Sequence, residues 1–166
     1  MIKCISREVV ERLRGRFERL YGTGLTDRCM ERAAMLVGRY GVGLEPRPTG
    51  PRWSERDALL IAYGDMVRRE GEAPLATLGR FARETLGGAF SMLHVLPFFP
   101  YSSDDGFSVL MYRAVNPGLG DWDDVRELGA SNRLMVDLVL NHCSRGHPWF
   151  KDYTLGVDPY RRYFVE

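Results

Sequence analysis

The apolar residues of the first forty positions recur at the spacing of α-helices. One set predicts a helix over residues 7–21 and comprises Val10, Leu13, Phe17 and Leu20; a second predicts a helix over 26–40 and comprises Met30, Ala33, Ala34 and Val37. Thr26 or Asp27 is expected to cap the second helix. Residues 41–52 hold three prolines and several glycines, which is typical of a linker. We therefore expect a helical N-terminal extension and linker over residues 1–50 and a separate domain over 51–166.

After Trp53 the pattern changes to short continuous apolar runs, which are typical of strands buried on both faces. These runs occupy residues 58–63, 92–97 and 134–140. Helical spacing predicts a helix over residues 74–86, and Asp121, with Asp124 in the first turn, is expected to open a short second helix. The order β-α-β-α-β predicts an α/β fold with a parallel sheet and right-handed crossovers. This alternation alone fits a doubly wound sheet and an α/β barrel equally.

Composition excludes several classes of partner and site. The chain has 166 residues with a formal net charge of +1, so its overall charge favours neither nucleic acid nor an anionic membrane as a partner. Cys4, Cys29 and Cys143 are widely spaced and form neither a zinc motif nor a disulfide framework, which fits reduced thiols. The sequence has no signal-peptide pattern and no apolar run of about 20 residues. We therefore expect a soluble cytoplasmic protein.

The residues that follow the predicted strands are suited to sugar recognition. In parallel α/β folds functional residues lie just past the carboxyl ends of the strands. Those positions hold carboxylates, an amide, imidazoles and aromatic rings, contributed by Tyr63, Asp65, Phe98, Phe99, Tyr101, Asp104, Asp105, Phe107, Asn141, His142, Ser144 and His147. Sugar hydroxyls require directional hydrogen bonds, and the apolar face of a sugar ring stacks on an aromatic side chain.

Two motifs carry a resemblance to a known family. Residues 94–108 (HVLPFFPYSSDDGFS) resemble the second-strand loop of sucrose phosphorylases and their glucosylglycerate phosphorylase relatives, in the α-amylase clan (glycoside hydrolase family 13). Residues 137–142 (DLVLNH) match the clan's D-x-V-x-N-H region at the end of the third strand, and residues 116–124 (NPGLGDWDD) between them are also similar. The resemblance runs from Trp53 to the end. It implies the first three βα units of a (β/α)₈ TIM barrel.

The resemblance assigns glucose-binding roles to four residues and a structural role to a fifth. Asp104 is expected to grip the terminal glucose hydroxyls with an arginine from later in such a domain, and Phe107 to form the platform beneath that glucose. His142 is expected to donate to the sugar near its primary hydroxyl, and Asn141 to shape the same corner. Asp137 is expected to hold the strand-end loop. The family implies no organic cofactor and no metal.

The neighbours of these residues are given structural roles. We expect Asp105 to be a turn residue and Phe98 and Phe99 to belong to the core. His94 is expected to be a hydrogen-bonded core histidine, and His147 to be structural. One departure from the family is Met111, where relatives carry an acidic residue. The absence of that carboxylate is expected to weaken hydrogen bonds within the loop.

The implied activity is that of a retaining α-glucosyl phosphorylase, which moves glucose from sucrose or a related α-glucoside to phosphate in carbohydrate metabolism. No catalytic residue is expected in the chain, because in the family the nucleophile, the acid/base and the stabilising carboxylate follow the fourth, fifth and seventh strands, beyond Glu166. The chain alone is therefore expected to be inactive and to self-associate through an uncovered barrel edge. The alternatives are a hydrolase or transglucosylase of the clan, amylase- or amylosucrase-like, and a non-catalytic truncated remnant.

Overall fold

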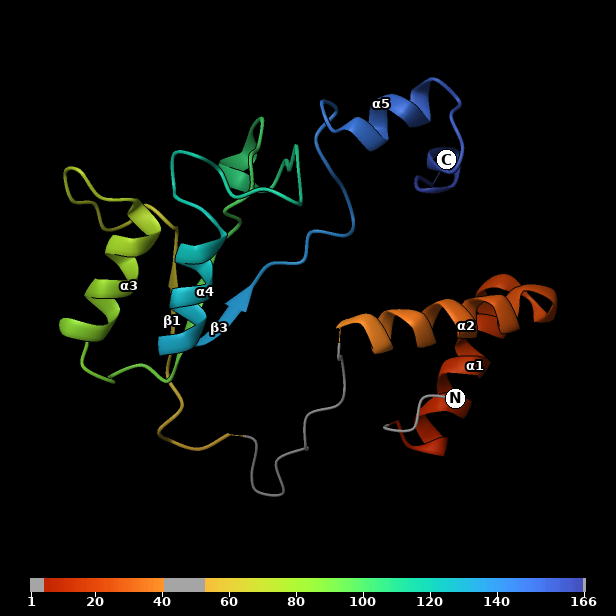
Figure 1. Ribbon diagram of the computed structural model, residues 1–166, viewed down its shortest axis with the longest axis horizontal. Helices are drawn as coiled ribbons and strands as arrows, with labels where there is room; N and C mark the ends of the chain where they lie inside the picture. The colour runs from red at the N-terminus through yellow and green to blue at the C-terminus, as the bar shows by residue number, and fades with distance from the viewer. Residues whose placement is uncertain (1–4, 41–52, 166) are drawn as a thin grey trace. The chain divides into compact units, whose positions relative to one another are not determined.

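The structure, a computed structural model, describes residues 5–40 and 53–165. The chain divides into two compact units, Met1–Arg52 and Trp53–Glu166 (Figure 1). The predicted linker over residues 41–52 and the cysteine at position 4 lie outside the described residues.

The first unit contains two helices, α1 Arg7–Tyr21 and α2 Thr23–Tyr40, that contact each other. The prediction of a helix over 7–21 is confirmed, but α2 begins three residues earlier than predicted. Gly22 has φ +74° and reverses the chain within one residue, so Thr26 lies inside the helix instead of capping it. The Thr26 hydroxyl donates to the Gly22 carbonyl at 2.9 Å, and Asp27 pairs with Arg14 at 2.7 Å. The predicted cap at Thr26 or Asp27 is therefore wrong.

The second unit is built on a three-stranded parallel sheet. Its strands are β1 Leu59–Ala62, β2 Met92–Val95 and β3 Arg133–Val136, in the order β1-β2-β3. Helix α3 Pro74–Glu84 joins the first two strands, and helix α4 Trp122–Ser131 precedes the third. Asp121 caps α4 and forms a capping box with Asp124, as the sequence predicts. The α/β class with parallel strands is thus confirmed.

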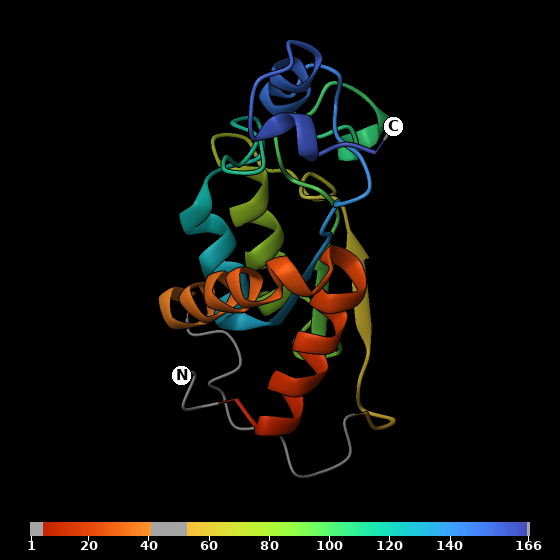
Figure 2. The same cartoon turned by 90° about the vertical axis from the view of Figure 1, so that its right-hand side faces the viewer.

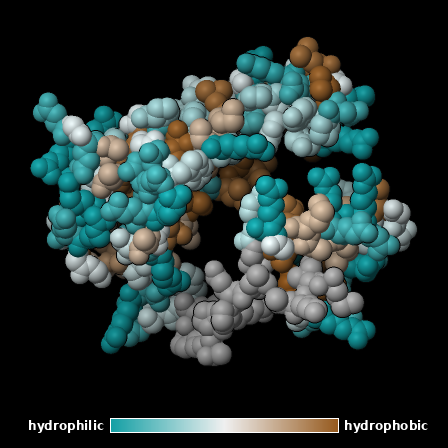
Figure 3. Space-filling model, viewed as in Figure 1, coloured by the Kyte–Doolittle hydropathy of each residue, from teal (hydrophilic) through white to brown (hydrophobic). Residues whose placement is uncertain are grey.

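Both helices pack on the same face of the sheet (Figure 2). Alternate strand residues point toward them, and the core that results comprises Ala62, Leu75, Leu78, Leu93, Val95, Phe98, Val115, Val125 and Leu128. Gly79 permits the close approach of α3 and α4, because a Cβ there would lie 3.0 Å from a methyl carbon of Leu128. The surface over the two helices is mainly hydrophilic (Figure 3). Phe98 is 2% exposed and Phe99 packs against the cluster, so both belong to the core as predicted.

The opposite face of the sheet carries apolar side chains that stay exposed. Ile61, His94 and Met135 are aligned across the three strands by the register. Ile61 is 54% exposed and Met135 is 41% exposed. Between them, His94 Nε2 lies 2.9 Å from Asp137 Oδ2, so His94 is hydrogen-bonded as predicted. The sheet therefore has one buried face and one face that a further layer would cover.

The third strand is shorter than the predicted run over residues 134–140. It ends at Val136, which lies opposite Val95, and Leu138 and Leu140 are 75% and 81% exposed. Continuing the ladder would place Leu138 opposite Pro97, which has no N–H to donate. Strand pairing therefore stops where the neighbouring strand reaches its proline.

Three short elements follow the strands and were not predicted. They are the 3₁₀ turns η1 Asp104–Gly106 and η2 Tyr160–Arg162 and the helix α5 Pro148–Thr154. His147 is 2% exposed, and its Nδ1 accepts a hydrogen bond from the Trp149 N–H at the start of α5. It is structural, as predicted. Among the described residues, no helix is both long and apolar enough to cross a membrane.

Candidate functional site

The candidate residues lie on two segments that leave the same edge of the sheet. Parallel strands bring their carboxyl ends together, so the loop after β2 and the segment after β3 are neighbours. The loop after β2 is closed on itself by an antiparallel bridge between Tyr101 and Val109. The Ser144 N–H donates to the Val109 carbonyl at 2.9 Å, which connects this loop to the segment after β3.

Gly106 fixes the tip of the loop after β2. Its φ is +105°, and a Cβ at this position would lie 2.6 Å from the Pro97 carbonyl oxygen. Asp104 and Asp105 precede it with φ of 60° and 46°, in the left-handed region that most residues avoid. The Phe107 N–H closes the turn on the Asp104 carbonyl at 2.9 Å. Asp105 is thus a turn residue as predicted, and the same turn leaves the Asp104 side chain exposed three residues from Phe107.

A hydrogen bond joins two of the four predicted site residues. His142 Nε2 lies 3.1 Å from the carbonyl oxygen of Phe107. Because a carbonyl oxygen only accepts, this contact requires the hydrogen on Nε2. The structure therefore brings His142 to Phe107, while the side chains of Asp104 and Asn141 are exposed on the same two segments.

Two hollows open at this edge of the sheet. The larger has a volume of about 760 Å³ and is lined by Asn141 and His142 together with aromatic side chains, among them Phe99, Tyr112, Trp149 and Tyr163. The other has a volume of about 600 Å³ and includes Asp105 and the ion pair of Arg68 with Asp65. Aromatic walls beside amide and imidazole groups match the surface that a sugar ring requires.

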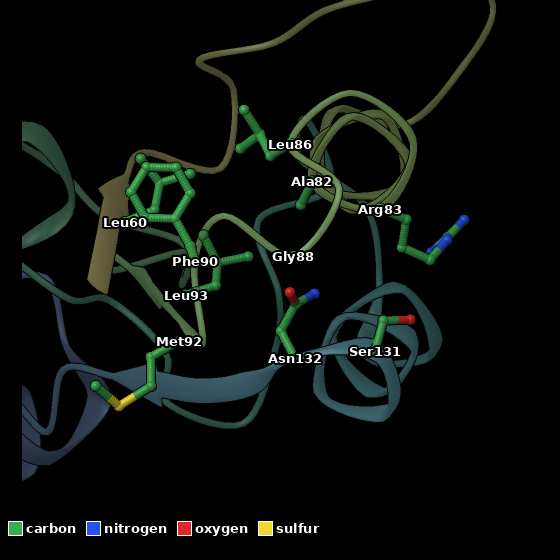
Figure 4. A pocket seen from close by; sticks show the side chains of 10 residues that line it. All are labelled: Leu60, Ala82, Arg83, Leu86, Gly88, Phe90, Met92, Leu93, Ser131 and Asn132. Atoms are coloured by element: carbon green, nitrogen blue, oxygen red, sulfur yellow. The ribbon is translucent and has the colours of Figure 1, made fainter. Parts of the chain in front are cut away.

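A smaller hollow of about 250 Å³ lies at the amino ends of the strands (Figure 4). It is lined by Phe90 and Met92 at the start of β2 and by Ser131 and Asn132 before β3. In α/β barrels this end of the strands serves stability and the opposite end serves catalysis. The candidate site is therefore at the carboxyl ends.

Burial shifts the pKa of three groups near the site. It raises the pKa of the Tyr112 hydroxyl, with a smaller contribution from Cys143, and it raises the pKa of the Cys143 thiol. A raised pKa leaves less thiolate at neutral pH, so it does not favour Cys143 as a nucleophile. Burial lowers the pKa of His147. Among the described residues, no group of three or more histidine, cysteine, aspartate or glutamate side chains is arranged to hold a metal ion.

The contribution of Tyr112 was not predicted from the sequence. The Tyr112 hydroxyl donates to the carbonyl oxygens of Val139 at 2.8 Å and His142 at 3.0 Å. The partners lie 27 and 30 residues further along the chain. No local pattern signals such a contact, because it depends on how the two loops fold together.

Comparison with known proteins agrees with the resemblance carried by the motifs. Residues 86–166 match the α-amylase catalytic domain. The chain is 60% identical over 109 residues to the glucosylglycerate phosphorylase of Spirochaeta thermophila, which covers 66% of the chain and 19% of that protein. It is 46% identical over 140 residues to the glucosylglycerate phosphorylase of Allomeiothermus silvanus, covering 81% of the chain and 25% of the relative. The second match is longer than Trp53–Glu166, so it includes part of the first unit.

A solved structure shares part of the fold of this chain. The sucrose 6F-phosphate phosphorylase of Thermoanaerobacter thermosaccharolyticum superposes with a TM-score of 0.54 at 31% identity, over 61% of this chain and 20% of that one. The chain spans about a fifth to a quarter of the length of these proteins. Over its matched residues the chain therefore belongs to the α-amylase family of catalytic domains, where it is similar to an N-terminal part of the glucosylglycerate and sucrose phosphorylases.

Proposed function

We propose that Trp53–Glu166 forms the first three βα units of a (β/α)₈ barrel that belongs to a retaining α-glucosyl phosphorylase. Consecutive parallel strands with helices on one face are the start of such a barrel, and the exposed face with Ile61 and Met135 is its interior side. The complete enzyme transfers glucose from an α-glucoside to inorganic phosphate. The identity to two glucosylglycerate phosphorylases makes glucosylglycerate the first donor to test and sucrose the second.

The observation that carries this proposal is the hydrogen bond between His142 and Phe107. It joins the loop after β2 to the segment after β3, and these two segments hold all four proposed glucose contacts. Asp104 accepts from the terminal hydroxyls, Phe107 supplies the apolar platform, and Asn141 and His142 close the corner near the primary hydroxyl. The nucleophile and acid/base come from other strands, so these residues bind and orient glucose.

A chimera tests the proposal. Trp53–Glu166 replaces the matching residues of the Spirochaeta thermophila glucosylglycerate phosphorylase, which is feasible at 60% identity. We expect phosphate-dependent release of glucose 1-phosphate, a loss in kcat/KM on the order of 100-fold for Asp104→Asn, and less than about a twofold change for the exposed control Asp123→Ala. A folded chimera that is inactive, or an Asp104→Asn variant as active as its parent, would contradict the proposal.

The same chimera tests the second candidate. Residues 86–166 match the α-amylase catalytic domain, so the alternative is an amylase-like hydrolase or a transglucosylase. Release of free glucose or of a transfer product without phosphate would support that alternative. A non-catalytic remnant predicts no turnover under either condition. For the isolated chain we expect neither glucose 1-phosphate release nor calorimetric glucose binding at millimolar concentration.

A further inference from the structure

The Tyr112 side chain connects the loop after β2 to the backbone of the segment after β3. It belongs to the loop after β2, and its hydroxyl donates to Val139 O at 2.8 Å and His142 O at 3.0 Å in the segment after β3. A tyrosine has one hydroxyl hydrogen, so the two carbonyls share it in a three-centre bond. Both carbonyls belong to residues beyond Val136, where the strand ladder has ended.

The ring of Tyr112 is fixed from several sides. Phe99 meets it edge-on with ring centroids 5.8 Å apart, and the rings of His147 and Trp149 lie at 5.3 and 5.7 Å. Burial raises the pKa of the Tyr112 hydroxyl, which therefore keeps its hydrogen at neutral pH. A rigid ring with a protonated hydroxyl is a donor in a constant position.

One hydrogen bond of Tyr112 ends on the backbone of a proposed glucose contact, His142. The carbonyl of His142 receives the hydroxyl, and the imidazole of the same residue reaches the Phe107 carbonyl at 3.1 Å. The backbone and the side chain of His142 are thus held by two different residues of the loop after β2. Removing the first bond frees the segment on which the second depends.

We propose that Tyr112 is a positioning residue, whose hydroxyl sets the backbone from Val139 to His142 and thereby holds the His142 imidazole against the Phe107 carbonyl. Its importance for catalysis rests on the proposed function, in which His142 and Phe107 contact glucose. Its effect on the His142 ring does not depend on that function, so the two are tested separately.

The tautomer of the His142 ring is observed by NMR on the full chain with ¹⁵N-labelled histidine. Because Phe107 O only accepts, wild-type His142 is expected as the Nε2–H tautomer. In Tyr112→Phe we expect the His142 nitrogen signals to move toward the average of the two tautomers, while those of His94, bonded to Asp137, stay in place. Tyr163→Phe is the matched control, because it removes a hydroxyl from the lining of the same hollow. Unchanged His142 signals in Tyr112→Phe overturn the proposal.

A second measurement covers the case in which Tyr112→Phe does not fold. In an equal mixture of light and heavy water, a hydroxyl that exchanges slowly gives separate ¹³Cζ signals for its protonated and deuterated forms. We expect Tyr112 of the wild type to show this doublet because its hydrogen is held between two carbonyls. A single averaged signal overturns the proposal.

The kinetic consequence is measured in the chimera described above. Tyr112→Phe is expected to lower kcat/KM by about tenfold, mainly through KM, since it loosens a proposed binding residue without removing it. Moved His142 signals with an inactive parent chimera would contradict the proposed function and leave the positioning role standing. If the His142 signals move but the kinetics do not change, Tyr112 positions His142 without any effect on the reaction. That result would overturn the catalytic importance of Tyr112.

Discussion

The imidazole of His94 and the carboxylate of Asp137 lie 2.9 Å apart and join β2 to the residue that follows β3. The two side chains are 16% and 27% exposed, although they lie on the face of the sheet that the helices do not cover. Both side chains are therefore largely desolvated, so each depends on the other for a hydrogen bond, and the contact holds the end of β3 where its ladder stops. The aspartate of the D-x-V-x-N-H motif thus has a structural contact at the end of β3.

We expect Asp137→Ala to lower the free energy of unfolding by about 1–3 kcal/mol, because it leaves His94 without its partner. A double-mutant cycle with His94→Ala should give a coupling energy of about 1 kcal/mol or more, measured by urea unfolding. The control cycle uses Asp123 and Arg126, which are 81% and 74% exposed and should couple by less than about 0.5 kcal/mol. Equal coupling in both cycles would mean that the His94 contact is no stronger than a surface ion pair.

Gly106 provides a test of the loop that carries Asp104. In Gly106→Ala the new methyl group meets the Pro97 carbonyl and also strains a φ of +105°. Gly71→Ala is the matched control, because Gly71 has φ +76° and open space around its Cβ position. Urea unfolding should show a loss of about 1 kcal/mol for Gly71→Ala and at least about 2 kcal/mol for Gly106→Ala. Similar losses would show that the loop moves away from Pro97 at no cost.

The sequence was sufficient for those features that arise from local patterns. Helical spacing located α1 and α3, continuous apolar runs located the three strands, and the Asp121 capping box located the start of α4. It was insufficient where tertiary contacts decide. The end of β3 depends on Pro97, two residues beyond the end of β2, and the start of α2 depends on the conformation of Gly22.

The same division holds for the candidate site. The motifs named His142 and Phe107, and the structure places them in contact. The motifs also named Asp104 and Asn141, whose side chains are exposed. The glucose-binding roles of all four residues stay predictions. Tyr112 was missed because its partners follow it by about thirty residues. The spacing of residues along the chain does not predict hydrogen bonds between two loops.

The uncovered face of the sheet predicts that the chain binds apolar dyes and associates with itself. Ile61 and Met135 are exposed on this face, where they lie on either side of His94 in the strand register. Replacing both by threonine, which keeps the β propensity, should reduce dye fluorescence and shift light-scattering masses toward the monomer. The control is Leu155→Ser, which removes a 77% exposed leucine just beyond α5. A wild-type chain that is monomeric, dye-negative and melts sharply would contradict this prediction.

His147 makes stability depend on pH below neutrality. Burial lowers its pKa from the ordinary 6.5, so the unfolded chain takes up this proton first as the pH falls. The contribution of neutral His147 to stability is therefore complete above pH 6.5 and declines as the pH falls toward the folded-state pKa, by at most about 1.4 kcal/mol per pH unit. The geometry agrees, because Nδ1 must be unprotonated to accept the Trp149 N–H.

His147→Asn separates this titration from the cap itself. Asparagine is also a good N-cap and has no proton to gain in this range, so α5 keeps an acceptor. Urea unfolding at pH 7.5 and 5.5 gives the change in the free energy of unfolding between these pH values for each protein. The wild type should lose more stability than the variant, and the difference between the two losses is the contribution of His147. The other histidines are present in both proteins and cancel. Equal pH slopes would mean that the His147 imidazole is reached by solvent in the folded chain, and that its 2% exposure does not shield it from protonation.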